Sequence, residues 1–132
     1  MYITLESDYA VRIMSFLAKR REKLDAKTIA ENTGVTLRFA LKILRKLVAA
    51  GVVQSFKGIQ GGYLIARDPS EITLLEIIET VEGRYCFSRC LGEDHECGQW
   101  CSGERCKVQS IYSNISALVR EQLAGVTFDQ LI

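Results

Sequence analysis

Long apolar runs and secretion signals are absent from this sequence of 132 residues. No stretch approaches the length of a membrane-spanning helix, and the first ten residues carry Glu6 and Asp8 where a secretory signal needs a basic start and then an apolar run. We therefore expect a cytoplasmic protein with no membrane partner. Repeats and low-complexity tracts are absent too, and a hydrophobic content of 48% is enough for one core.

Cysteine is missing from four fifths of the chain, and histidine occurs once. All 5 cysteines lie between Cys86 and Cys106, and His95 lies among them. An odd number of clustered cysteines without an export signal argues against a disulfide framework and favours metal ligation or redox chemistry. No Cys-x-x-Cys pair occurs, and no second histidine is available as a general base, so we expect that the protein is not an enzyme.

Positive charge is concentrated in the first half of the chain. Residues 1–60 hold 11 Lys and Arg against 5 Asp and Glu, whereas residues 61–132 hold 6 against 11. Clustered positive charge is typical of proteins that bind nucleic acid, although two solvated faces give the same asymmetry. The basic half is therefore where DNA contacts are expected.

Three helices are predicted in the basic half. The spacing of apolar residues predicts helices over residues 7–20, 26–32 and 37–50, the first of which begins at Ser7 or Asp8. A tight turn separates the second helix from the third, which is the arrangement of a helix-turn-helix.

The limits of the second and third helices follow from their flanking residues. Asp25 precedes the second helix and Gly34 ends it, while Thr36 precedes the third helix and Gly51 ends it. The apolar positions of the third helix predict that it buries Phe39, Ala40, Ile43 and Leu47.

The remaining residues of the third helix are basic and suit a duplex. Its first turn would lie nearest the base edges and its later cations nearer the phosphates, although an ordinary three-helix core with a basic solvated face explains the same pattern. The candidate DNA contacts on this segment are Thr36, Arg38, Phe39, Lys42, Arg45 and Lys46.

A β-hairpin is predicted directly after the third helix. Residues 52–56 alternate as a strand, residues 58–62 supply a glycine-rich turn, and residues 63–66 begin a return strand. A hairpin in this place is typical of the wing of a winged helix, whose glycine amides can approach a phosphate, although the glycines could simply form a tight turn. The candidate DNA contacts of this wing are Ser55, Lys57, Gly58, Gly61 and Gly62.

Two more helices complete the prediction. Thr73 and Glu76 form a capping box at the start of a fourth helix, which Gly83 ends. The last helix carries an apolar stripe that packs either in the chain's own core or, as we prefer, against a second subunit. The stripe consists of Val108, Ile111, Tyr112, Ile115, Leu118 and Val119. After it, a terminal turn capped by Thr127 is expected to bury Val126, Phe128, Leu131 and Ile132.

The predicted fold is mainly α with a small β wing: a winged helix-turn-helix with a long C-terminal dimerisation helix. Its expected divisions are a DNA-binding domain over residues 1–83, a cysteine-rich metal- or cluster-binding loop over residues 84–107, and the dimerisation helix with its terminal turn over residues 108–132.

Several short motifs resemble one family of bacterial regulators, the IscR and NsrR type of winged-helix repressor, also called the Rrf-two (Rrf2) family. The likeness covers nearly the whole chain and is most specific where the Gly-Gly-Tyr-Leu wing precedes a cysteine loop. Its residues are Ser7, Asp8, Tyr9, Ala10, Ile29, Ala30, Gly34, Val35, Leu47, Ala50, Gly51, Val53, Lys57, Gly58, Gly61, Gly62, Tyr63 and Leu64.

The resemblance implies an iron-sulfur cluster, more often 2Fe-2S than 4Fe-4S, held by three cysteines and a variable fourth ligand. The cysteines are Cys90, Cys97 and Cys106, with Cys101 as a substitute for one of the last two because the final gap is longer than the family's. One branch has an aspartate at the position of Asp8. Another branch has a histidine at the position of Gln109, so Asp8 is the better candidate here.

Other uses of the cysteines remain open. Zinc is an alternative because three cysteines with His95 or a carboxylate satisfy its tetrahedral coordination, and a reversible disulfide is another. Cys86 is expected to be a small buried residue.

The resemblance further implies a homodimeric repressor on an inverted-repeat operator in double-stranded DNA. It would sense redox state, iron-sulfur status or nitric oxide. The family often has arginine where Lys57 stands and a polar residue at Leu41, so its operator sequence does not transfer to this chain.

Overall fold

The computed structural model describes residues 3–92 and 106–132, and this part of the chain is mainly helical with one small sheet. Strands β1 and β2 pair antiparallel, with Val53 opposite Ile65 and Phe56 opposite Gly62. The predicted fold class is confirmed. The elements in chain order are α1 (Leu5–Arg20), α2 (Ala26–Thr33), α3 (Leu37–Ala49), β1 (Val53–Phe56), β2 (Gly62–Ile65), the 3-10 helix η1 (Pro69–Glu71), α4 (Leu74–Glu82), η2 (Arg89–Leu91), α5 (Lys107–Ala124) and η3 (Phe128–Leu131).

Short polar side chains begin the first four α-helices. Asp25, Thr36 and Thr73 each accept a hydrogen bond from the backbone amide three residues later, at 2.8–3.3 Å, as predicted. The predicted start of α1 is wrong, because Thr4 caps it and accepts from the Ser7 amide at 3.2 Å. Ser7 lies inside the first turn and is fully buried, so its side chain faces the core rather than the helix end.

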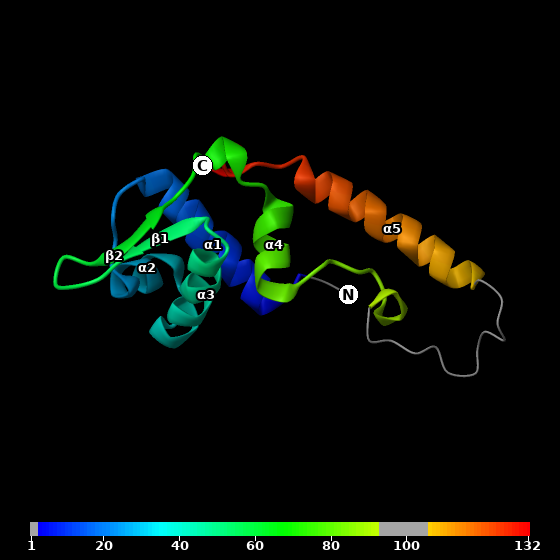
Figure 1. Cartoon of the computed structure of the whole chain (residues 1–132), viewed down its shortest axis with the longest axis horizontal. Coiled ribbons are helices and arrows are strands. Elements are labelled where there is room, and N and C mark those ends of the chain that lie inside the picture. The colour runs from blue at the N-terminus through cyan, green and yellow to red at the C-terminus, as the bar shows by residue number, and fades with distance from the viewer. Residues whose placement is uncertain (1–2, 93–105) are drawn as a thin grey trace.

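Helix α1 forms the centre of the molecule and packs against α2, α3 and α4 (Figure 1). Helix α3 contributes a stripe with helical spacing to this core, formed by Ala40, Ile43, Leu44 and Leu47. The expectation that Phe39 is buried is wrong. Because the stripe is centred on Leu44, Phe39 lies at its edge, 40% exposed, with its ring edge-on to that of Tyr9 at a centroid distance of 5.9 Å.

The turn between α2 and α3 is the tight helix-turn-helix connection that the sequence predicts. Gly34 closes α2 in the left-handed conformation, with φ of 69°, and donates to the Ala30 carbonyl. The chain then needs only Val35, which is buried, before Thr36 starts α3. This short connection holds α3 beside the hairpin (Figure 1).

Helix α5 begins at a distance from the helix-turn-helix body and runs back toward it, and the segment that follows rejoins the body (Figure 1). Leu74 donates to the Val126 carbonyl at 2.8 Å, and Phe128 donates to the Ile72 carbonyl at 3.0 Å. Phe128 is fully buried in the core of the first 83 residues, so that core is not complete without the C-terminal segment.

The terminal turn differs from the prediction in two respects. Leu131 and Ile132 are 43% and 50% exposed, so only Phe128 of this turn enters the core, and the Thr127 side chain does not cap η3. Among the described helices, none combines the length and the apolar character needed to cross a membrane.

Candidate nucleic-acid interface and cysteine site

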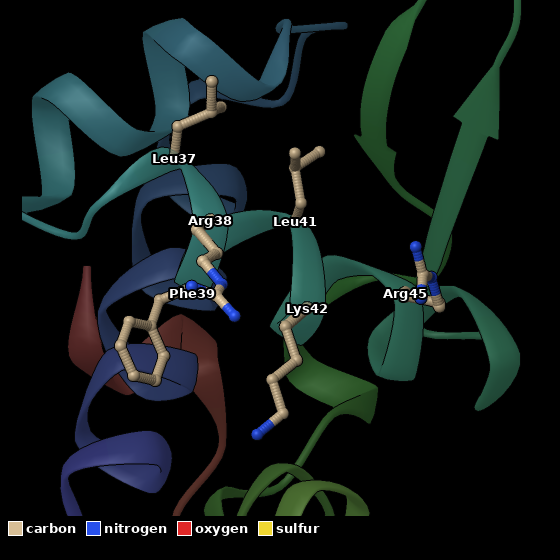
Figure 2. A pocket seen from close by; sticks show the side chains of 6 residues that line it. All are labelled: Leu37, Arg38, Phe39, Leu41, Lys42 and Arg45. Atoms are coloured by element: carbon tan, nitrogen blue, oxygen red, sulfur yellow. The ribbon is translucent and has the colours of Figure 1, made fainter.

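Helix α3 presents a basic face that contains no acidic residue. An open hollow on this face is lined by Leu37, Arg38, Phe39, Leu41, Lys42 and Arg45. Figure 2 shows Leu37 and Leu41 pointing to the same side of the helix, Lys42 pointing away from them, and Arg45 beside the hairpin. Within the described residues, neither Arg38 nor Arg45 forms an ion pair, so both guanidinium groups can receive a phosphate or a base.

Glu6 of α1 neutralises part of the positive charge of α3. Its carboxylate lies 2.7 Å from the Lys46 ammonium and 3.7 Å from that of Lys42. Lys46 also donates to the Val81 carbonyl near the end of α4 at 3.0 Å. The hydrogen bond from Lys46 is the main reason that the pKa of Glu6 is held below its ordinary value. Lys46 therefore joins three helices, whereas Lys42 is 56% exposed at its side chain.

The hairpin brings its polar residues next to the end of α3. Ser55 on β1 and Tyr63 on β2 are paired across the sheet, and both line a second hollow with Leu41, Arg45 and Val48. Lys57 follows β1 at the exposed turn. Residues of the wing and of α3 therefore line one continuous surface.

Two glycines of the wing are required by the chain itself. A Cβ atom on Gly61 would lie 2.3 Å from the Phe56 carbonyl oxygen, and one on Gly62 would lie 2.6 Å from the Leu24 carbonyl oxygen. The Gly61 amide already donates to the Gly58 carbonyl at 2.9 Å. Close packing of the turn is therefore a sufficient reason for glycine at both positions.

Cys90 and Cys106 lie on two segments that Gln109 joins. The Gln109 side-chain amide donates to the Cys90 carbonyl at 2.9 Å, and its backbone amide donates to the Cys106 sulfur at 3.5 Å, where Cys106 caps α5. The Cys106 sulfur thus lies at a helix N-terminus, which favours a thiolate, and thiolates are soft ligands that suit a metal centre. Cys97, Cys101 and His95 lie outside the described residues.

Asp8 has an ion-pair partner on its own helix. Its carboxylate pairs with Arg12 one turn later at 2.7 Å, and both side chains are about half exposed. In the described part of the chain, no three His, Cys, Asp or Glu side chains lie close enough to hold a metal ion. Asp8, Cys90 and Cys106 of one chain therefore do not form a metal site by themselves within the described residues.

The comparison with known proteins decides the family. The model of the Rrf2 family, described as an iron-dependent transcriptional regulator, matches residues 3–132. The chain belongs to the Rrf2 family. It is accordingly a DNA-binding transcriptional regulator and not an enzyme, as the sequence predicted.

Relatives of this Rrf2 chain match it over most of their length. A protein of Aquifex aeolicus described as a helix-turn-helix-type transcriptional regulator is 30% identical over 94% of this chain and 86% of its own. The regulator IscR of Photorhabdus laumondii is 28% identical over 100% of this chain and 79% of its own.

Solved structures of regulators share the fold. CymR of B. subtilis, described as a global cysteine regulator, superposes with a TM-score of 0.77 at 26% identity, covering 99% of this chain and 95% of that one. IscR of T. potens superposes with a TM-score of 0.78 at 22% identity, covering 99% and 85%.

Contacts around the cysteine segment of this Rrf2 chain were not predicted from the sequence. Arg120 of α5 holds both carboxylate oxygens of Glu79, at 2.8 and 3.1 Å, and Glu79 also accepts from the Tyr85 amide at 2.6 Å. The buried Ser116 hydroxyl accepts from the Phe87 amide at 2.8 Å. The only sequence signal for these contacts was Ser116, a polar residue within the apolar stripe of α5.

These contacts have two consequences. The Arg120 guanidinium is the main reason that the pKa of Glu79 is held below its ordinary value. The segment that leads into Cys90 is also tied to α5 at several points. Cys86 within it is half-buried rather than buried as expected, with its sulfur 3.9 Å from the Leu91 carbonyl.

Proposed function

We propose that this regulator represses transcription as a homodimer on an inverted-repeat operator, and that an iron-sulfur cluster sets its affinity for DNA. The observation that carries the DNA-binding part is the acid-free face of α3, where Arg38 and Arg45 have no ion-pair partner within the described chain and Arg45 borders the wing. A helix of this kind enters the major groove while a wing contacts the adjacent backbone. A regulator of chromosomal genes acts in the cytoplasm of a bacterium.

The role proposed for each DNA contact follows from its position. Arg38 and the capped first turn at Thr36 lie nearest the base edges, with Phe39 at their margin, while Lys42 and Arg45 contact phosphates. On the wing, Ser55, Lys57 and the turn from Gly58 to Gly62 approach the backbone beside the groove. Lys46 is a structural residue in this proposal, since its ammonium already has two partners.

Dimerisation is supported by the exposure of α5. Ser116 is the only buried residue that this helix contributes, while Val108, Ile111 and Leu118 are 40%, 57% and 61% exposed. A row of large apolar side chains along an extended helix is costly to leave in water. A second copy of α5 would cover the row and would also place two copies of α3 on the two half-sites of an operator.

The cluster would be held by Cys90, Cys97 and Cys106, with Asp8 of the second copy as fourth ligand and Cys101 as the alternative cysteine. The Gln109 bridge between Cys90 and Cys106 supports this set. A bound cluster, of 2Fe-2S type by preference, supplies iron-sulfide bonds that respond to redox state and nitric oxide. The chain's own part is to hold Cys106 at the start of α5 with Cys90 tied to it through Gln109, and to connect Asp8 with the DNA-binding face.

Glu6 provides this connection. It lies in the same turn of α1 as Asp8, and it contacts Lys42 and Lys46 of α3. A ligand that pulls on Asp8 would shift Glu6 and thereby change both the position and the effective charge of α3. Cluster loss would then alter operator affinity through the contacts of Glu6 with Lys42 and Lys46.

Zinc or a thiol-disulfide switch is the second candidate, and the structural neighbours favour the switch. One of them is described as the oxidised form of CymR from Staphylococcus aureus. The same cysteines would then act as redox-active thiols without iron.

An anaerobic visible spectrum with iron and sulfide analysis separates these candidates. Cluster binding predicts a coloured protein that loses its visible absorption in the Cys90→Ser variant and keeps it in Cys86→Ser, the matched control within the same segment. Asp8→Ala is expected to make the cluster less stable. A colourless protein with bound zinc would refute the iron-sulfur proposal, as would equal operator affinity before and after removal of the cluster.

A further inference from the structure

The apolar residues of α3 form two sets, only one of which serves the fold. Ala40, Ile43, Leu44 and Leu47 are fully buried and complete the contact of α3 with the core. Leu37 and Leu41 are 47% and 40% exposed, one helical turn apart. Phe39 is exposed to a similar extent but packs against the Tyr9 ring, so the two leucines are the ones that the fold leaves unexplained.

The surroundings of the two leucines are basic. Arg38, Lys42 and Arg45 line the same hollow as Leu37 and Leu41, and Leu41 also borders the hollow between α3 and the wing (Figure 2). Pairing this face with the same face of a second copy would bring like charges together, which disfavours self-association there. A polyanion is the complementary partner. The apolar ridge formed by Leu37 and Leu41 must then match an apolar group on that polyanion.

Double-stranded DNA offers one such group in the major groove, the C5 methyl of thymine. Neighbouring cations hold the phosphates, so the leucines are pressed toward the base edges rather than left in water. Residues four apart on a helix are separated by about 6 Å along its axis. This distance corresponds to about two base-pair steps of DNA, at 3.4 Å for each step.

We propose that Leu37 and Leu41 read thymine methyl groups, so that each operator half-site carries thymines about two base-pair steps apart beneath α3. This inference rests on the proposed placement of α3 in the major groove and adds the base chemistry that the helix selects. The two leucines are specificity-determining residues, while Lys42 and Arg45 supply affinity for any sequence.

The test removes one methyl group at a time. The operator is first obtained by selecting tight binders from a random duplex library with the full-length protein. Each thymine of the selected half-site is then replaced by deoxyuridine, which lacks only the C5 methyl, and dissociation constants are measured by fluorescence anisotropy at one salt concentration. The proteins compared are the wild type, Leu37→Ala, Leu41→Ala and Leu131→Ala, the last being an exposed leucine at the C-terminus as matched control.

We expect at least one deoxyuridine substitution to weaken binding of the wild type and of Leu131→Ala by about fourfold, the effect of burying one methyl-sized group. The same substitution is expected to have no effect on the leucine variant that has lost the contact. This coupling between one side chain and one methyl group is what a merely structural role would not produce.

Three results would overturn the inference, and they are distinguishable. If Arg38→Gln and Arg45→Gln weaken binding but no leucine is coupled to a thymine methyl, α3 still lies in the groove and methyl recognition is refuted. Arginine variants that bind as tightly as the wild type would refute the placement of α3 itself. Leucine variants that change the oligomeric state at unchanged operator affinity would assign the ridge to a contact between copies.

Discussion

Replacing Lys46 by methionine is expected to weaken the fold while leaving the electrostatic part of DNA binding unchanged. Lys46 and Arg45 are neighbours on α3, and their sequence alone predicts the same phosphate-binding role for both. In the structure, the Lys46 ammonium contacts the Glu6 carboxylate at 2.7 Å and the Val81 carbonyl at 3.0 Å, while Arg45 is exposed beside the wing. The variant Arg45→Met therefore serves as the matched control.

The expected loss of stability follows from the partial burial of this ion pair. The side chains of Lys46 and Glu6 are 35% and 23% exposed. A hydrogen bond to a charged group contributes about 1.5–3 kcal/mol when buried, and an exposed ion pair contributes about 0.2–1 kcal/mol. We therefore expect Lys46→Met to lower the free energy of unfolding by about 1–2 kcal/mol and the Tm by about 4–8 °C.

The pH dependence of this loss has a definite sign. Lys46 holds the pKa of Glu6 below its ordinary value of 4.5, so the pair stabilises the fold fully above that value and ceases to do so as the pH falls through the pKa in the folded state. The difference in Tm between the wild type and Lys46→Met is therefore expected to shrink as the pH is lowered below 4.5.

Thermal unfolding at one fixed protein concentration and salt titrations of operator binding measure the two effects separately. Arg45→Met is expected to reduce the slope of log K against log salt by about 0.9 for each copy bound, with little change in Tm. Lys46→Met is expected to keep the wild-type slope. A Lys46→Met protein with the wild-type Tm and the reduced slope of Arg45→Met would refute this assignment.

Three further predictions follow from other contacts. Arg120→Met removes both hydrogen bonds to Glu79 and is expected to lower the midpoint of urea unfolding at neutral pH. This loss disappears on acidification because Arg120 holds the pKa of Glu79 below its ordinary value, and an unchanged midpoint at neutral pH would contradict the prediction. Gly61→Ala places a Cβ 2.3 Å from the Phe56 carbonyl oxygen and is expected to lower the Tm as well as DNA affinity, whereas a loss of affinity at wild-type Tm would point to a direct DNA contact. Leu118→Glu, on the exposed face of α5, is expected to shift the protein to monomers in analytical ultracentrifugation and to weaken operator binding, and a stable dimer would refute the proposed interface.

Local sequence signals predicted most of the fold. Asp25, Thr36 and Thr73 begin helices because a side-chain oxygen near a free amide acts over three residues, which is a property of the sequence alone. The glycine turn of the wing was also predictable, because glycine permits the tight backbone of such a turn. The family resemblance was likewise carried by short motifs, and the family model over residues 3–132 confirmed it.

The sequence could not assign partners to charges or coverage to apolar faces. Lys46 and Arg45 are equivalent in a helix taken alone, and only the packing of Glu6 from α1 and Val81 from α4 distinguishes them. Phe39 looked like a core residue until Leu44 took the centre of the stripe. The contacts of Lys46 with Glu6 and with Val81 join residues 40 and 35 positions apart, a range that helical periodicity does not reach.

The cysteine site shows the same division. The clustering of the cysteines predicted a reactive or metal-binding segment, because thiols gathered in one short stretch can act together. Only the tertiary structure joined Cys90 to the start of α5 through Gln109 and paired Asp8 with Arg12. Sequence thus decided which residue types are present and which local elements they form, while packing decided which of them meet, since proximity in space depends on how distant elements bury one another.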